Sequence, residues 1–238
     1  MTRPADFHIS PQPDGSSCGP TCLQAMYRFY GDEMQVEEIL KTIPQLDDGG
    51  VLGVQLACHA LRRGYSVDIY TCNLQMFDPT WFRGVRPDLR QKLERQAAVK
   101  SKNKRKLQFA TQAYLEYLDL GGRVDMRDLS PAFVGELLAD GTPVLTGLSS
   151  TWLYGGPRET ATDNPQDDDV GGVPQGHFVV LYDWQAATRH VRVADPYRPN
   201  PFAPEPVYSV DVKRLIASIL LGIVTYDANL MLLRPRGR

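Results

Sequence analysis

The spacing of apolar residues differs between the two halves of this 238-residue chain, and that difference constrains the fold more than any other feature. In the first half, apolar side chains recur at intervals of three and four, which is the period of an α-helix. In the second half, short apolar runs are separated by turn-forming residues, which is typical of strands. Helices first and strands after predict one α+β domain, 1–238, with N-terminal helices packed on a C-terminal antiparallel sheet.

The expected elements follow from this pattern and from the Gly and Pro residues that interrupt it. Helices are predicted over 18–30, 36–43, 54–63 and 212–221, with another beginning at Ser130-Pro131. Strands are predicted over 66–71, 143–148, 177–184, 189–195 and 229–233. No internal repeat interrupts the single domain.

Residues 83–119 are predicted to form a basic helical insertion. Between Arg83 and Lys106, ten Lys and Arg residues stand against two acidic ones. A charge run of this kind is usually a solvated helix face, and an acidic partner bound to Arg83–Lys106 is the alternative. The stretch 155–176 is rich in Gly, Pro and Asp, so we expect a mobile loop that acts as a lid.

Cys18 is the best candidate nucleophile. Gly19 and Pro20 follow it where the first helical pattern begins, so its thiol lies at a helix N-terminus. The positive end of the helix dipole and the unpaired backbone N–H groups there favour a thiolate, the nucleophilic form of cysteine. Gly19 would also keep the approach to the thiol uncrowded.

A hairpin is predicted to bring a histidine and an aspartate together. Two apolar runs flank 185–188, and a turn centred near position 186 places His177 opposite Asp195, with Cβ atoms about 5 Å apart. A carboxylate beside an imidazole fixes its tautomer and stabilises its charged form. Asp183 is a rival acid, but it lies six residues along the same strand from His177, about 20 Å away.

Gln12 stands six residues before Cys18 and completes the constellation. Its side-chain amide N–H, together with the backbone N–H of Cys18, could hold the oxyanion of a tetrahedral intermediate. The order Gln, Cys, His and Asp therefore supplies the roles that amide hydrolysis through a thiol requires.

These residues resemble a known family. Gln12, the pair Cys18-Gly19, the run that begins with His177 and the sequence V-A-D-P around Asp195 are similar to motifs of the papain-like peptidases that cut bacteriocin leaders after a double glycine. The resemblance covers roughly the first 75 residues and 143–233, and it implies a papain-like cysteine peptidase fold. It also implies Gln12 in the oxyanion hole, Cys18 as nucleophile, His177 as base and Asp195 as its orienting acid. Such domains usually precede a transporter, which the 238 residues do not contain, so we do not expect the bacteriocin substrate to carry over.

Other residues that could bind metals have simpler interpretations. Cys22 is expected in the core, and His59 on a helix surface. The spacings among Cys18, Cys22 and Cys58-His59 match structural zinc sites poorly. His8 and His190 are expected at the surface. The aspartates of the lid loop lack the spacing of a calcium-binding loop. Trp152 and Tyr154 are expected either to line the cleft or to pack in the core.

Composition limits the function classes. With a net charge of −2, nucleic acid is an unexpected partner, and no apolar run is long enough to span a membrane. The N-terminus lacks the apolar core of a signal peptide, so we expect a cytoplasmic protein with reduced thiols.

The motifs predict a hydrolase of peptide or amide bonds that needs no cofactor and acts on a peptide or protein substrate. An acyl transferase using the same thiol is one alternative, which product analysis with added amines would reveal. A non-catalytic peptide-binding module on the same scaffold is the other.

Overall fold

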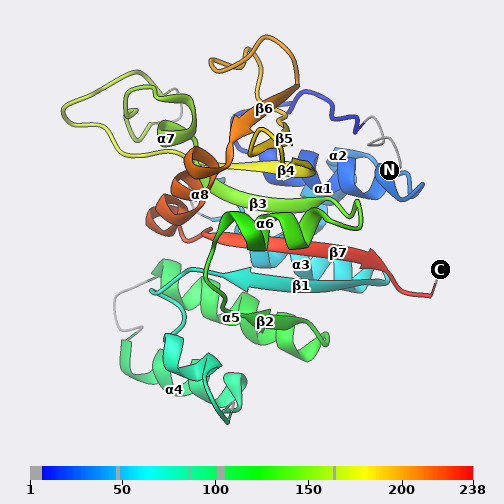
Figure 1. The fold of residues 1–238 in the computed structure, drawn as a ribbon. Helices are drawn as coiled ribbons and strands as arrows, with labels where there is room; N and C mark the ends of the chain where they lie inside the picture. The colour runs from blue at the N-terminus through cyan, green and yellow to red at the C-terminus, as the bar shows by residue number, and fades with distance from the viewer. Residues whose placement is uncertain (1–6, 47–48, 86, 101–104, 163–164, 238) are drawn as a thin grey trace.

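The centre of the computed structural model, which describes residues 7–46, 49–85, 87–100, 105–162 and 165–237, is a seven-stranded sheet (Figure 1). The strand order is β2-β1-β7-β3-β4-β5-β6. The strands are β1 (Tyr65–Thr71), β2 (Arg123–Asp125), β3 (Val144–Ser149), β4 (Gly176–Gln185), β5 (His190–Ala194), β6 (Val207–Asp211) and β7 (Asn229–Pro235). All neighbouring strands are antiparallel except β1 and β2, which are parallel. The sheet is therefore mixed, whereas a wholly antiparallel sheet was predicted.

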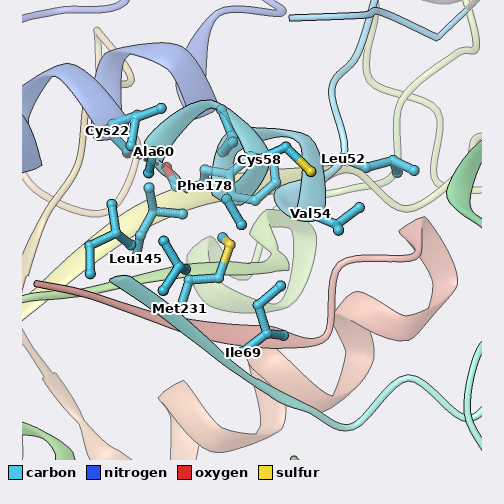
Figure 2. Packing of buried hydrophobic residues seen from close by; sticks show 14 of the residues in the cluster. Cys22, Leu52, Val54, Cys58, Ala60, Ile69, Leu145, Phe178 and Met231 are labelled. Atoms are coloured by element: carbon cyan, nitrogen blue, oxygen red, sulfur yellow. Dashed lines mark hydrogen bonds between the residues drawn. The ribbon is translucent and has the colours of Figure 1, made fainter. Parts of the chain in front are cut away.

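Helices cover both faces of the sheet. They are α1 (Cys18–Phe29), α2 (Val36–Thr42), α3 (Gly53–Arg62), α4 (Leu89–Lys100), α5 (Arg105–Asp119), α6 (Pro131–Leu138), α7 (Ser150–Tyr154) and α8 (Val212–Leu221), with short 3-10 helices η1 (Pro79–Phe82) and η2 (Gly222–Thr225). One apolar core joins α1, α3 and α5 to the sheet, and a second joins α6 and α8 to it. Successive residues of β4 point to opposite cores: Phe178 packs in the first, shown in Figure 2, and Val179 in the second. The α+β class is therefore confirmed, with helices on two faces.

The predicted basic insertion consists of two different helices. Only Leu93 of α4 is buried, whereas α5 buries one side, including Tyr114 and Tyr117. The Tyr117 hydroxyl donates to the carbonyls of Val67 in β1 and Arg123 in β2. Two parallel neighbouring strands need a crossover connection, and α5 is part of it. The second helix of this segment therefore belongs to the core of the fold.

Several basic side chains of this segment have partners within the chain. Arg90 pairs with Glu94 and Asp119, and the Lys92 ammonium lies 5.9 Å from the ring centre of Trp81. Residues 86 and 101–104 lie outside the described residues. These contacts agree with a solvated, internally paired helix face, and an acidic partner at Arg83–Lys106 stays a prediction.

Helix ends follow the capping signals in the sequence. The Ser130 side chain accepts a hydrogen bond from the Phe133 backbone at 3.2 Å, and Pro131 occupies the first turn of α6. Asp211 caps α8 by accepting from the Lys213 backbone at 2.8 Å, and α8 has the predicted bounds.

Candidate active site

Cys18 is the first residue of α1, as predicted, and is 9% exposed. The first backbone N–H groups of a helix have no partner within the helix, so positive potential surrounds this thiol. Gly19 also has a packing role, and its predicted effect on access to the thiol stays a prediction. A Cβ at this position would lie 3.0 Å from side-chain atoms of Leu56 and Val51, so glycine lets the start of α1 pack closely against the first core.

His177 lies between Cys18 and Asp195. Its Nε2 is 2.8 Å from Oδ1 of Asp195, and Cys18 lies close enough to its ring to help raise the pKa of His177. Since Nε2 faces the carboxylate, the nitrogen that remains for the thiol is Nδ1. His177 is 7% exposed and Asp195 is fully buried. The fold thus brings three of the four candidate residues into one connected group.

The hairpin that brings His177 to Asp195 has a different register from the predicted one. Leu181 pairs with Val193, which is two positions from the prediction, and the ladder shifts again between Leu181 and Asp183. The turn lies further along the chain than predicted. Arg189, in the turn, has a left-handed φ of 57°, and the first paired residues next to the turn are Gln185 and His190. A shift of two positions keeps side chains on the same face, so the two residues still meet, diagonally.

Asp195 accepts hydrogen bonds from four further groups. Oδ2 accepts from the hydroxyls of Tyr154 at 2.9 Å and Tyr208 at 2.6 Å, and from the amide of Asn200 at 2.9 Å. Oδ1, besides its contact with His177, accepts from the backbone N–H of Tyr197 at 2.9 Å. A buried carboxylate is stabilised as an anion when several donors surround it, so this set holds Asp195 ionised and fixed.

In the folded protein the pKa of His177 is raised and that of Asp195 is lowered. Burial alone would lower the pKa of His177, but the negative charge of Asp195 and its hydrogen bond outweigh burial and raise it to about 10. Burial likewise opposes ionisation of Asp195, but His177 and the other donors lower its pKa to about 2. Burial and the Asp195 charge raise the pKa of the Tyr154 and Tyr208 hydroxyls, which remain protonated donors. At neutral pH the centre therefore holds an imidazolium and a carboxylate.

Aromatic rings surround the imidazole. The ring centre of His177 lies 6.0 Å from that of Tyr197 and 6.1 Å from that of Tyr154, and the two tyrosine rings stack on each other. Tyr154, which was expected either in the cleft or in the core, thus contacts the site directly, whereas Trp152 is 51% exposed. The tyrosines limit the orientations open to His177.

The loop that carries Gln12 lies against the segment that carries Asp195. Its backbone N–H donates to the carbonyl of Pro196 at 2.9 Å, so the loop before α1 is held against the residue that follows Asp195. Its side-chain Nε2 donates to the carbonyl of Asp14 at 2.7 Å, while its Oε1 is buried with no partner among the described residues. One hydrogen bond of the Gln12 amide is therefore made within the loop, and the NH2 group has a second N–H that can donate elsewhere.

Cys22 and Cys58 lie in packed surroundings, whereas Cys72 has intermediate exposure. The Cys22 thiol donates to the Phe178 carbonyl at 3.2 Å, and the Cys58 thiol to the Ala113 carbonyl at 3.6 Å. Figure 2 shows both among apolar side chains, and burial raises the pKa of both thiols. The prediction that Cys22 is a core residue is confirmed.

His59 was predicted at the surface, and this is wrong. It is 8% exposed, and its Nδ1 lies 2.7 Å from the Tyr27 hydroxyl. The apolar spacing of α3 gave no sign of this polar pair because Tyr27 lies in a distant part of the sequence. Cys58 and His59 thus each have a partner other than a metal, whereas His8 is exposed as expected.

The predicted lid loop is held by hydrogen bonds of its own. Glu159 and Val173 exchange two backbone bonds, of 3.2 and 2.8 Å, and the Asp168 carboxylate accepts from the backbone N–H groups of Val170 and Gly171. Asp163 lies outside the described residues. The rival acid Asp183 lies opposite Arg192, towards the far end of β4 from His177. Whether the loop gates the site stays a prediction.

Two of the residues around Asp195 were not found from the sequence. Tyr208 lies on β6, a strand that was missed, and Asn200 lies in the loop before it. A signal for β6 was present, since apolar and polar residues alternate over 208–211, but the turn-rich residues before it obscured a five-residue strand.

Comparison of the sequence with protein-family models and with curated proteins found no match. Three solved structures align with nearly the whole chain. The peptidase domain of Streptococcus ComA, a bi-functional ABC transporter involved in a quorum sensing pathway, has a TM-score of 0.45 and 11% identity over 97% of this chain and 99% of its own. A C39-like peptidase from Bacillus anthracis has a TM-score of 0.48 and 13% identity, covering 98% and 96% of the two chains. Xylellain, a cysteine protease from Xylella fastidiosa, has a TM-score of 0.44 and 14% identity, covering 97% and 83%. All three are described as peptidases or proteases.

Proposed function

We propose that this chain is a papain-like cysteine peptidase in which Cys18, His177 and Asp195 form the catalytic triad. The observation that carries the proposal is the position of His177, whose ring is 2.8 Å from a buried carboxylate and near enough to Cys18 for that thiol to help raise the pKa of His177. A cation beside a thiol stabilises negative charge on sulfur, as nucleophilic attack requires.

The proposed reaction has two steps. The Cys18 thiolate attacks the carbonyl carbon of a peptide bond, and His177 gives its proton to the leaving amine as the C–N bond breaks. Water then attacks the thioester, His177 accepts a proton from that water, and the C–S bond breaks to release the acid. Asp195 holds the imidazole and stabilises its charge throughout.

Gln12 is proposed as an oxyanion donor, together with the Cys18 backbone N–H. In this role its Nε2 exchanges the Asp14 carbonyl for the substrate oxygen. Its loop is tied to Pro196 through the backbone, so the side chain can rotate while the loop keeps its place.

The cellular setting follows from the thiol. The four cysteines are free, and the mechanism needs a reduced Cys18, so we expect the protein to act in a reducing compartment such as the cytoplasm. None of the described helices is both long and apolar enough to cross a membrane.

A peptide library derived from a digested proteome tests the proposal. Mass spectrometry of the products should reveal cleavage by the wild-type protein and none by Cys18→Ala or His177→Ala. Cys72→Ala is the matched control and should cleave normally. Cleavage that persists in both Cys18→Ala and His177→Ala would contradict the proposal.

A further inference from the structure

A pocket of about 390 Å³ lies between α7, the end of α8 and η2, and one of its lining residues, Pro174, stands three residues before His177. Its walls are formed by Ser149, Thr151, Trp152, Gly155, Gly156, Arg158, Pro174, Arg214, Leu221 and Val224. This volume lies within the range of about 300–1,000 Å³ typical of ligand pockets.

The pocket adjoins the backbone that positions the site. Ser149 pairs with Gly176, the residue before His177, and the Thr151 hydroxyl accepts from the backbone N–H of Gln175 at 2.9 Å. Gly155 follows Tyr154, whose hydroxyl donates to Asp195. A side chain in this pocket would therefore belong to a residue close to the scissile bond.

Three apolar side chains of the pocket face water. Trp152 is 51% exposed, Leu221 is 40% exposed and Val224 is 53% exposed. Covering exposed apolar surface stabilises a complex by about 25 cal/mol per Å² removed from water. An apolar group of the substrate would gain from binding between them.

The charges of the pocket have one sign. Its two charged lining residues are Arg158 and Arg214, and no lining residue is acidic. The Arg214 guanidinium donates to the carbonyls of Trp152 and Leu153 at 3.0 and 2.8 Å, so its positive charge is fixed at the wall. A lysine or arginine side chain entering here would meet charge repulsion.

We propose that this pocket selects a large apolar side chain of the peptide substrate near the scissile bond and rejects basic ones, an inference that rests on the proposed peptidase function. A substrate with glycine at the position whose side chain enters the pocket would leave the pocket empty, so glycine at that position is expected to bind weakly.

Binding to an inactive protein tests the pocket separately from catalysis. Acetylated and amidated fluorescent hexapeptide pools, with Leu, Lys or Gly fixed at one central position at a time, are titrated against the Cys18→Ala variant. At one position, the Leu pools should bind at least tenfold more tightly than the Lys and Gly pools. Adding Val224→Glu should reverse the preference between Leu and Lys, because a carboxylate then stands at the pocket wall.

Controls make each outcome decisive. Val99→Glu, on the exposed face of α4, should leave every preference unchanged. Should Val224→Glu unfold, Trp152→Ala should reduce the preference for Leu over Gly. The inference is overturned if no pool is preferred, if Gly is bound best, or if the folded pocket variants keep the wild-type preferences. Selective binding without any Cys18-dependent cleavage by the wild-type protein would contradict the peptidase proposal and leave the pocket assignment standing.

Discussion

The Tyr208 hydroxyl donates a 2.6 Å hydrogen bond to Oδ2 of Asp195, while Oδ1 of the same carboxylate contacts His177. A residue on the edge strand β6 thus holds the acid that orients the proposed base. Because the contact is buried, its loss affects both the stability of the fold and the position of Asp195.

Replacing Tyr208 by Phe removes this donor and leaves the ring in place. We expect the free energy of unfolding to fall by about 2 kcal/mol, since the donor is hydrogen-bonded to a buried charge. Urea denaturation measures the change. Tyr70→Phe, on β1 where the ring packs edge-on against Phe133, is the control and should change stability by less than about 0.5 kcal/mol. Equal losses in the two variants would contradict the role given to Tyr208.

The ion pair of His177 and Asp195 predicts how stability depends on pH. The folded pKa of Asp195 is about 2 against an ordinary value of 3.8, so its contribution is present above pH 3.8 and is lost as the pH falls towards 2. The folded pKa of His177 is about 10 against 6.5, so its contribution is present below pH 6.5 and is lost as the pH rises towards 10. The stabilisation from the pair is thus greatest between these limits.

Urea denaturation of the wild-type protein and of Asp195→Asn at pH 3, 5 and 9.5 measures this dependence. The difference in stability between the two proteins should be largest at pH 5 and smaller at both extremes. A difference that stays constant across the three values would show that the pair is not charged in the folded protein.

Much of the fold could be predicted from the sequence because several helices and strands have strong local signals. The bounds of α8 follow from the Asp211 cap and the apolar face, and the run from His177 is apolar enough to be a central strand. The mixed sheet was not predicted, because the crossover helix α5 follows a run of basic residues that indicated a surface segment. Tertiary pairing of β1 with β2 has no signal in local periodicity.

The main residues of the candidate site could be predicted from the sequence, but the residues that contact them could not. The positions of Cys18, His177 and Asp195 followed from a helix start and a hairpin, and the error in register was harmless because it was even. Tyr208 and Asn200 contact Asp195 only through the folded chain, so nothing near Asp195 in the sequence indicated them. The partner of the Gln12 side chain was also unpredictable, since a backbone carbonyl in its own loop competes for the amide.

Gln12→Ala tests the proposed oxyanion donor. Loss of one such donor lowers kcat by about 10²- to 10³-fold, and we expect that loss here with little change in KM. Steady-state kinetics on a peptide found in the library screen measures it. Ser16→Ala removes a hydroxyl that bonds Asp14 in the same loop and should leave kcat within about threefold, which separates chemistry from loop structure. A Gln12→Ala enzyme with normal kcat would exclude Gln12 from the reaction.

The central claim is that His177 activates the Cys18 thiol, and alkylation tests it without knowledge of the substrate. Cys72 is the reference thiol for this test. It has intermediate exposure, whereas Cys18 is 9% exposed, so exposure alone favours faster alkylation of Cys72. Burial also raises the pKa of the Cys72 thiol.

The measurement is the rate of iodoacetamide labelling at each cysteine at pH 6.5, followed by peptide mass spectrometry in the wild-type protein and in His177→Ala. We expect Cys18 to be labelled at least tenfold faster than Cys72 in the wild type. Most of this advantage should disappear in His177→Ala while the melting temperature stays within a few degrees. Faster labelling of Cys72 in the wild type, or an undiminished advantage of Cys18 in His177→Ala, would contradict the central claim.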